Sequence, residues 1–351
     1  MGYEIDYIAV GDGERSGDAI AFRYGDLLGE NGPVSQTVVV IDGGTIESAE
    51  KLVERIKNEY GKGTVDYVIC THPDMDHLSG VKIILEKLQV KNLYIHIPWN
   101  HVEEIQDNFK EDFSIEELNK KLQKEFELVN DVVALAIEKG VAIEEPFAGT
   151  PINDNIVILG PTKQYYEELL CQSDKTPEVK SALQQALEAY KKFQEKAVEW
   201  VEDSLGIEIL DDNAETSPEN NSSVILLAIL YEKKILFTGD AGIQALTNAV
   251  GLADAAGIVL TDLTFFHIPH HGSKHNLGNK ILEKIKAEIA YVSASKDSPK
   301  HPSKRITNAL IKNGARVYVT RGSHLYHHKN APDRNWSTAV QEVFHERFQE
   351  E

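Results

Sequence analysis

Cysteine is scarce in this sequence, and long apolar runs are missing. The 351 residues include only two cysteines, Cys70 and Cys171, which make neither a disulfide framework nor a CxxC metal pair. The longest apolar runs, VSQTVVVID and SSVILLAILY, have strand length, whereas a membrane helix needs about 18 residues. The start of the chain has neither the basic nor the apolar stretch of a secretory signal. We therefore expect a cytoplasmic protein with no membrane segment.

Basic residues are also outnumbered. There are 36 Lys and Arg against 56 Asp and Glu, a formal net charge of −20. Such a surface repels nucleic acid at long range, which argues against a high-affinity DNA-binding module. Bound divalent cations can reverse the sign locally, so a phosphate ester, nucleic acid included, can still bind at a metal site. The 42% of hydrophobic residues is typical of a globular protein.

The order of the apolar patterns predicts two β-rich halves separated by helices. Strand patterns dominate up to about residue 100 and again from residue 223, and each half also contains helical patterns. Residues 101–145 and 163–215 are rich in Glu, Lys, Gln and Leu, and we expect helical insertions there. One apolar stripe runs from Ile115 to Val129 behind a capping box at Ser114, and a second runs from Leu183 to Trp200. We expect one α/β domain over 1–351, a four-layer α/β/β/α sandwich with its site at the strand ends.

Polar residues gather where four apolar strands end. The segment THPDMDHLSG begins at Thr71, directly after the apolar run VDYVIC, and holds two histidines and two aspartates within six positions. One such cluster can be a surface loop, but four in one chain predict a shared site. The residues at the four strand ends are Asp42; His72, Asp74, Asp76 and His77; Asp240; and His270 with His271.

The spacing within the first cluster favours two cations. His72, Asp74 and Asp76 alternate, so an extended turn can point them the same way, and His77 can face a second point. Two metal ions a few ångströms apart can activate a bridging water and hold the oxygens of a displacement reaction. Asp240 is then a suitable bridging carboxylate. Asp42 is expected to contact the side chains around the metal ions rather than an ion itself, orienting a ligand or ordering the loop.

These residues resemble the motifs of the metallo-β-lactamase superfamily. The usual HxHxDH motif reads His72-Pro-Asp74-Met-Asp76-His77 here, and Asp42, Asp240 and the IPHHGS segment match three further motifs. Within that superfamily the chain is most similar to the hydrolase domain of the ComEC/Rec2 DNA-uptake proteins, through THPDxDH, TGD and PHHGS. The resemblance covers about 1–100, 150–162 and 218–322. It implies a four-layer αββα metallo-β-lactamase sandwich with the helical insertions outside the common fold.

The sequence departs from the superfamily pattern at two places. A third-motif histidine is absent from VILGPT, as it is in the related branch, and the membrane channel of the DNA-uptake proteins is missing. Transport is therefore not implied. Asp74 replaces an imidazole nitrogen with a carboxylate oxygen, which is a harder ligand in the acid–base sense and favours Mn²⁺ relative to Zn²⁺. We expect two divalent ions, Mn²⁺ or Zn²⁺.

The resemblance also implies roles for individual residues. His271 is favoured over His270 as a metal ligand, and His270 is then a substrate contact. Asp76, His270 and His301 are the expected catalytic residues, with His301 contacting phosphate or protonating a leaving group. Ser273 and Lys274 are expected to bind an anionic substrate oxygen.

The leading hypothesis for function is a dinuclear phosphodiesterase or nuclease-like hydrolase that uses a metal-bound hydroxide. One alternative is a hydrolase of another ester class, such as a phosphorylcholine ester or a lactone. Another is a partner-dependent module that docks a protein through the inserted helices. The pattern leaves the natural substrate, the partner and the oligomeric state open.

Overall fold

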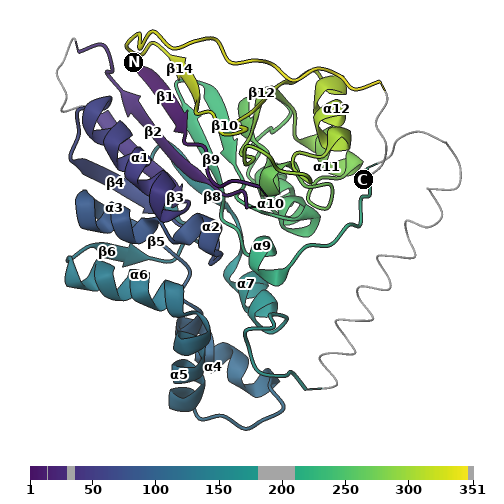
Figure 1. The fold of residues 1–351 in the computed structure, drawn as a ribbon. Coiled ribbons are helices and arrows are strands. Elements are labelled where there is room, and N and C mark those ends of the chain that lie inside the picture. Colours follow the sequence, from purple (N-terminus) through teal and green to yellow (C-terminus); the bar gives the residue numbers. More distant parts are fainter. Residues whose placement is uncertain (14, 30–35, 181–209, 347–351) are drawn as a thin grey trace, which may run out of the picture.

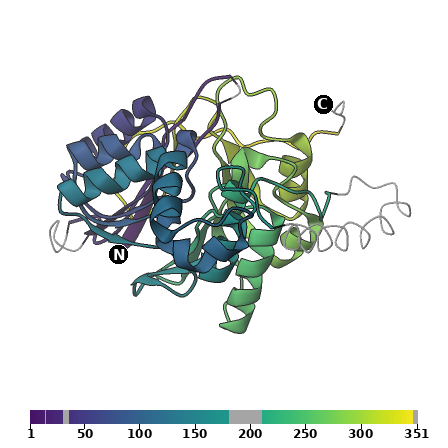
Figure 2. The same cartoon turned by 90° about the horizontal axis from the view of Figure 1, so that it is seen from below.

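The computed structural model describes residues 1–13, 15–29, 36–180 and 210–346. Two seven-stranded sheets pack face to face, and helices cover the outer face of each (Figure 1). Figure 2 shows the purple-to-teal helices on one side of the sheets and the green helices on the other. The predicted four-layer sandwich is confirmed. No helix in the described ranges is both long enough and apolar enough to cross a membrane.

The first sheet has the strand order β14-β1-β2-β3-β4-β5-β6. Strands β3 to β6 run parallel, whereas β2 is antiparallel to β3, so that Ala19 pairs with Gly43 and β2 begins where β3 ends. The strands are β1 (Gly2–Tyr7), β2 (Ala19–Gly25), β3 (Gln36–Gly43), β4 (Thr64–Ile69), β5 (Gln89–Tyr94), β6 (Ala142–Glu144) and β14 (Leu325–Lys329).

The second sheet has the order β13-β12-β11-β10-β9-β8-β7. Strands β10 to β13 run parallel, and β9 forms an antiparallel hairpin with β10. The hairpin turns at Tyr231 and Glu232, which both have positive φ, as a twisted two-residue turn requires. The strands are β7 (Pro151–Asn153), β8 (Ile156–Gly160), β9 (Ile225–Leu230), β10 (Lys233–Phe237), β11 (Leu263–His267), β12 (Ala287–Val292) and β13 (Arg316–Val319).

Alternation along the strands divides the apolar side chains among three cores. In β3, Val38 and Val40 face the outer helices, whereas Val39 and Ile41 face the other sheet. A strand buried on both faces explains the uninterrupted run TVVVI. The outer helices are α1 (Ile46–Asn58), α3 (Val81–Lys87) and α6 (Glu127–Glu138) on the first sheet, and α10 (Ile243–Ala255), α11 (Asn279–Lys284) and α12 (Lys304–Lys312) on the second.

The first helical segment projects beyond the sheets in Figure 1. Its helices are η2 (Pro98–His101), α4 (Val102–Ile105), η3 (Gln106–Asn108) and α5 (Ile115–Glu125), followed by α6. The predicted capping box at Ser114 and Glu117 is present. The prediction of one continuous apolar stripe from Ile115 to Val129 is wrong in two respects. The backbone of Phe126 is non-helical and divides the stripe, and the Ile115 side chain is 46% exposed.

Further along the chain, α7 (Lys163–Leu170) and α9 (Pro218–Asn221) lie beside each other. The second predicted stripe, Leu183 to Trp200, falls outside the described residues. The ring of His101 connects the first segment to α7, since its nitrogens lie 3.1 Å from Glu145 Oε1 and 3.0 Å from Glu167 Oε1.

The C-terminal segment is held to the first sheet by buried charges. Arg334 donates to carboxylates of both Glu4 and Asp6 on β1, and all three side chains are almost fully buried. Arg23 on β2 also pairs with Glu4. The first strand and the segment after β14 therefore meet in one charge network, where losing any member would leave buried charge uncompensated.

Candidate metal centre

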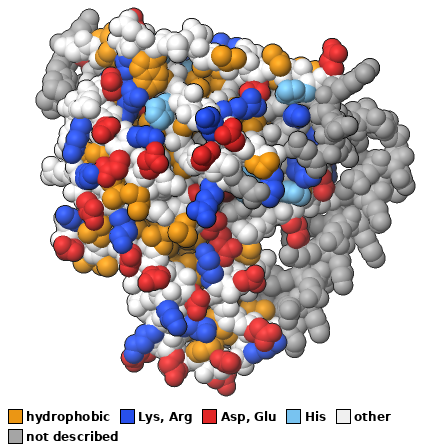
Figure 3. All heavy atoms as spheres, viewed as in Figure 1, with side chains coloured by type: hydrophobic (Ala, Val, Ile, Leu, Met, Phe, Trp, Pro, Cys, Tyr) orange, Lys and Arg blue, Asp and Glu red, His pale blue; other side chains and the backbone are white. Residues whose placement is uncertain are grey.

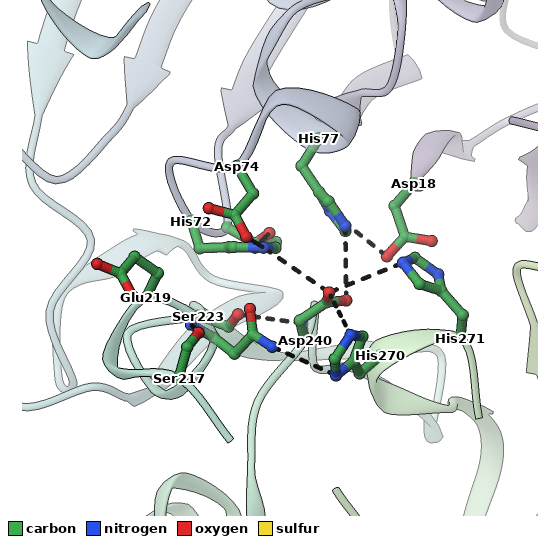
Figure 4. A network of polar contacts seen from close by, with 12 residues as sticks. Asp18, His72, Asp74, His77, Ser217, Glu219, Ser223, Asp240, His270 and His271 are labelled. Atoms are coloured by element: carbon green, nitrogen blue, oxygen red, sulfur yellow. Dashed lines mark hydrogen bonds and ion pairs between the residues drawn. The ribbon is translucent and has the colours of Figure 1, made fainter. Parts of the chain in front are cut away.

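The site lies where strands of both sheets end. Asp42 is near the end of β3, and His72 and His77 follow β4 in the loop and short helix α2 (Met75–Leu78). Asp240 follows β10, and His271 lies in η4 (Pro269–Gly272) after β11. Because β3 and β4 are parallel, as are β10 and β11, each pair of carboxyl ends meets at one sheet edge. Figure 4 shows the two groups of side chains pointing toward one another.

Asp240 is at the centre of this arrangement. Its carboxylate is almost completely buried, and its backbone N–H donates to Ser223 Oγ at 3.0 Å. Four imidazoles surround it (Figure 4). The distances from Nε2 to the nearest Asp240 oxygen are 3.8 Å for His72, 3.5 Å for His77, 3.8 Å for His270 and 3.7 Å for His271.

Asp42 sets the orientation of two of these histidines. Its carboxylate accepts from the Thr71 N–H at 2.7 Å and from the Thr71 hydroxyl at 2.6 Å, and it lies 2.8 Å from His77 Nδ1. Since the Thr71 hydroxyl donates to Asp42, it accepts from His72 Nδ1, 3.0 Å away. In its neutral form each imidazole then carries its proton on Nδ1 and presents the Nε2 lone pair to the site.

Several atoms around Asp240 lack hydrogen-bond partners in the described part of the protein. Buried atoms without one include His72 Nε2, His77 Nε2, Asp240 Oδ1 and both ring nitrogens of His271. Buried polar atoms without partners are rare, and a bound ion is one explanation for a cluster of them. Imidazole nitrogens and carboxylate oxygens are the ligands that Zn²⁺ and Mn²⁺ accept, so the residues fit divalent metal ions.

Among the described residues, three sets of possible metal-ligand atoms share members. Within each set, all the atoms lie within 4.8 Å of one another. The sets are Asp76, His77 and His271; Asp18, His77 and Asp240; and Asp42, His72 and His77.

Charges within the cluster are strongly coupled. Burial alone would raise the pKa of Asp240, but His77, His271 and His270 hold it well below its usual range. Burial alone would lower the pKa of His77, but Asp240 and Asp42 raise it well above its usual range. Burial lowers the pKa of His271. The centre therefore holds an ionised carboxylate among imidazoles, at least one of which remains neutral at physiological pH.

Asp74 and Asp76 lie at the start of α2. Asp74 Oδ2 is 3.7 Å from His72 Nε2, and Asp74 Oδ1 is 3.8 Å from the Lys175 ammonium in the segment after α7. Asp76 belongs to the set with His77 and His271. The two carboxylates thus lie on different sides of the cluster, Asp74 with His72 and Asp76 with His271.

The η4 loop presents two adjacent histidines in a strained backbone. His270 and His271 have φ of 47° and 56°, the left-handed region that non-glycine residues rarely adopt. The buried Asn276 side-chain N–H donates to the Asp240 carbonyl at 2.9 Å, and its oxygen lies 3.0 Å from His270 Nδ1. This contact directs His270 Nε2 toward Asp240. Both histidines therefore reach the same carboxylate oxygen.

The remaining predicted residues lie around η4. The Ser273 hydroxyl is buried and accepts from the His275 N–H at 3.3 Å, whereas Lys274 is exposed. The His301 ring centre is 5.7 Å from that of His270 and 6.2 Å from that of His271. Burial, His271 and His270 lower the pKa of His301 to about 4, so its ring is neutral at physiological pH.

Asp18 is a site residue that the sequence analysis missed. It is fully buried and lies 3.8 Å from His77 Nδ1 and 3.2 Å from His267 Nε2. Among the described residues, neither of its carboxylate oxygens has a hydrogen-bond partner. It directly precedes β2, whose antiparallel pairing brings its start to the end of β3. Gly17 permits this path, since a Cβ there would lie 2.1 Å from the Asp76 carbonyl oxygen. The available signal was SGDAI, a polar turn ending in Asp before an apolar strand.

The family model of the metallo-β-lactamase superfamily matches residues 34–296, and the chain belongs to this superfamily. Its members are generally metal-dependent hydrolases. A curated relative, ComE operon protein 3 of Bacillus subtilis (strain 168), is 23% identical over 335 residues. That match covers 89% of this chain but only 33% of the relative, so the chain spans about a third of the relative's length.

Two solved structures are also similar to this chain. The metallo-β-lactamase fold protein YhfI from Bacillus subtilis has a TM-score of 0.45 at 10% identity, with 94% of this chain and 100% of that chain covered. A diphosphatase from the PhnP family has a TM-score of 0.41 at 12% identity, with 93% and 98% covered.

Proposed function

We propose that this protein is a dinuclear metal-dependent phosphodiesterase. His72, Asp74 and Asp240 would hold one divalent ion, and Asp76, His77 and His271 would hold the other, with Asp240 shared. Two such ions supply an activated water and neutralise charge on phosphoryl oxygens. The proposal rests mainly on the buried, unpartnered ligand atoms that converge on Asp240.

Asp74 supports a hard metal and an anionic substrate. Its carboxylate occupies the position where the superfamily usually has an imidazole, which makes the ligand set richer in oxygen and favours Mn²⁺ relative to Zn²⁺. The Lys175 ammonium beside Asp74 adds positive charge at the edge of the site. A phosphodiester brings one negative charge to this edge, whereas a lactone brings none.

Residues around η4 would handle the substrate. His270 is 28% exposed, enough to contact a substrate oxygen. The neutral ring of His301, centred 5.7 Å from that of His270, would contact the phosphate or relay a proton to a leaving group by accepting at one nitrogen and donating from the other. Asp76 would act in catalysis by holding its ion beside His271. Lys274 reaches solvent and would attract the phosphate, with Ser273 fixing the loop. Asp42 would hold His72 and His77 in the ligand tautomer.

The surface favours a small or localised substrate. Net charge is −20, and on the face seen in Figure 3 acidic and basic side chains are interspersed without a broad basic area. Long nucleic acid binds mainly through such basic areas. A short phosphodiester, or a single strand held at one point, fits this surface better. The projecting helices α4 and α5 would be the docking surface for a protein partner.

A metal-resolved substrate panel tests the proposal. Chelated protein is reconstituted with Mn²⁺ or Zn²⁺ and assayed on bis-p-nitrophenyl phosphate, p-nitrophenyl phosphorylcholine, a lactone and single-stranded DNA. We expect Mn²⁺-dependent hydrolysis of the phosphodiester, and at least a hundredfold loss in Asp74→Asn and Asp240→Asn. Asp262→Asn, which removes an exposed carboxylate paired with Lys234, is the matched control.

Two outcomes would contradict the proposal. If the lactone is the only substrate hydrolysed, the site is an esterase of a different class. If both aspartate variants retain the activity of the control, these carboxylates do not hold the catalytic ions.

A further inference from the structure

One basic side chain lies next to a proposed metal ligand. The Lys175 ammonium is 3.8 Å from Asp74 Oδ1, and the other oxygen of the same carboxylate, Oδ2, is 3.7 Å from His72 Nε2. Lys175 follows α7 and belongs to the second predicted insertion, residues 163–215, which lies outside the family resemblance. A residue of the insertion thus contacts a ligand of the metal centre.

The chain around Lys175 forms a hydrogen-bonded turn at the end of α7. The Thr176 hydroxyl donates to the Leu170 carbonyl at 2.7 Å, and the Thr176 N–H donates to the Ser173 carbonyl at 3.1 Å. The Lys175 N–H donates to Ser173 Oγ at 3.1 Å, and this hydroxyl donates in turn to Glu219 Oε1 at 2.5 Å. These contacts connect α7 to α9 and hold the ammonium at the edge of the site.

The contact between Lys175 and Asp74 contributes little to folding. The two side chains are 37% and 38% exposed, and ion pairs so open to water add little stability. The ammonium also lies 5.4 Å from the centre of the Phe126 ring. A methionine at this position would keep an unbranched apolar stem beside that ring, so Lys175→Met removes the charge without disturbing the packing.

The charges around Asp74 are unbalanced once an ion is bound. His72 binds a metal ion only as a neutral imidazole, so it adds no charge. A divalent ion and the Lys175 ammonium together exceed the carboxylates of Asp74 and Asp240 by one formal positive charge, even before Asp240 is shared with a second ion. The ammonium and the ion therefore repel each other across Asp74, and an anion bound by both would relieve this repulsion.

We propose that Lys175 and the ion at Asp74 together bind one anionic oxygen group of the substrate, so that the anion and this ion strengthen each other's binding. Such coupling is reciprocal, because an anion that tightens the ion is itself bound more tightly by the loaded site. The substrate class is then an ester that keeps a negative charge, as a phosphodiester does, rather than a neutral ester. This inference rests on the metal site of the proposed function.

Mn²⁺ binding to the chelated full-length protein, measured by chelator competition, tests the coupling without catalysis. In Lys175→Met the affinity for one of the two ions should rise about fivefold, because the repelling charge is gone. Lys175→Arg keeps the charge and should remain close to the wild-type protein. Lys163→Met is the matched control, since that ammonium lies in the same insertion but pairs with Glu104 and Glu167.

Two methyl esters of phosphoric acid isolate the role of the anion. Dimethyl phosphate is an anionic diester, whereas trimethyl phosphate has a similar shape without the charge. At high millimolar concentration and matched ionic strength, only dimethyl phosphate should raise the Mn²⁺ affinity of the wild-type protein, by about fivefold. This increase should fall to about twofold in Lys175→Met and persist in Lys175→Arg.

Three results would overturn the inference. An Mn²⁺ affinity of Lys175→Met at or below that of the wild-type protein would mean that the ammonium does not oppose the ion. A dimethyl phosphate effect equally large in Lys175→Met would place the anion elsewhere, and an equal effect of trimethyl phosphate would mean that charge is not recognised.

The same measurements separate this inference from the proposed function. Wild-type protein that binds no Mn²⁺ would remove the proposed function and this inference with it. Intact coupling in a protein that hydrolyses no phosphodiester would remove the proposed function alone.

Discussion

Asp42→Asn should weaken metal binding although Asp42 contacts no metal in the proposed arrangement. The buried carboxylate accepts three hydrogen bonds, from the Thr71 N–H, the Thr71 hydroxyl and His77 Nδ1. Asparagine has nearly the same volume and tolerates the positive φ of 55° at this position. It replaces one accepting oxygen with an N–H donor, so the effect comes from chemistry rather than from shape.

Either orientation of the new amide loses an interaction. If the NH₂ group takes the place of Oδ1, it faces the Thr71 N–H and two donors meet. If it takes the place of Oδ2, His77 must accept at Nδ1 and carry its proton on Nε2, which then cannot bind a metal. A lost hydrogen bond to a charged group is worth about 1.5–3 kcal/mol. Loss of such an orienting carboxylate typically lowers metal affinity about 10–100-fold.

The measurement is a chelator competition that gives the Mn²⁺ and Zn²⁺ affinities of the variant and the wild-type protein. Asp66→Asn is the control, because Asp66 also accepts from a backbone N–H, that of Val38, but contacts Lys91 rather than a histidine. Unchanged metal affinity in Asp42→Asn, with normal folding, would refute the idea that Asp42 sets the histidine tautomers.

Three further substitutions test other parts of the structure. Burial alone would lower the pKa of His101, but its two glutamate partners raise this pKa above the ordinary 6.5. The contacts between His101 and the glutamates therefore stabilise the folded protein fully below about pH 6.5, and this stabilisation is lost as the pH rises through the raised pKa. His101→Gln should therefore lower the melting temperature more at pH 5.5 than at pH 9. Gly272 has a φ of +78°, and Gly272→Ala would place the new Cβ 2.7 Å from Pro302 Cβ. This substitution should destabilise the protein by about 1–3 kcal/mol and disturb η4. In the control Gly251→Ala, the new Cβ meets nothing within 4 Å and should not destabilise the protein. Arg334→Met leaves buried carboxylates uncompensated and should cost about 3 kcal/mol in urea denaturation, and a loss under 1 kcal/mol would contradict the buried network.

The sequence predicted those parts of the site that local pattern determines. Apolar runs such as TVVVI and VDYVIC identify strands. Asp42 directly follows the first run, and His72 comes two positions after the second. Parallel strands that end at one sheet edge bring such residues together without any knowledge of side-chain packing. The two-sheet sandwich follows from the same runs and from the family resemblance.

Asp18 could not be found in the same way, because it precedes a strand instead of following one. Its place in the site depends on the antiparallel pairing of β2 with β3, which joins segments distant in sequence. The break at Phe126 was missed for a related reason. Leu118, Leu122 and Phe126 keep helical spacing, and this spacing gives no sign of the non-helical backbone at Phe126.

The metal content of the purified protein tests the central claim most directly. Chelated wild-type protein dialysed against Mn²⁺ or Zn²⁺ should retain two ions per chain by elemental analysis, because the proposed arrangement places His72 and Asp74 on one side of Asp240 and His77 and His271 on the other. Asp240→Asn should retain one ion or none. Wild-type protein that retains no ion under these conditions would contradict the account.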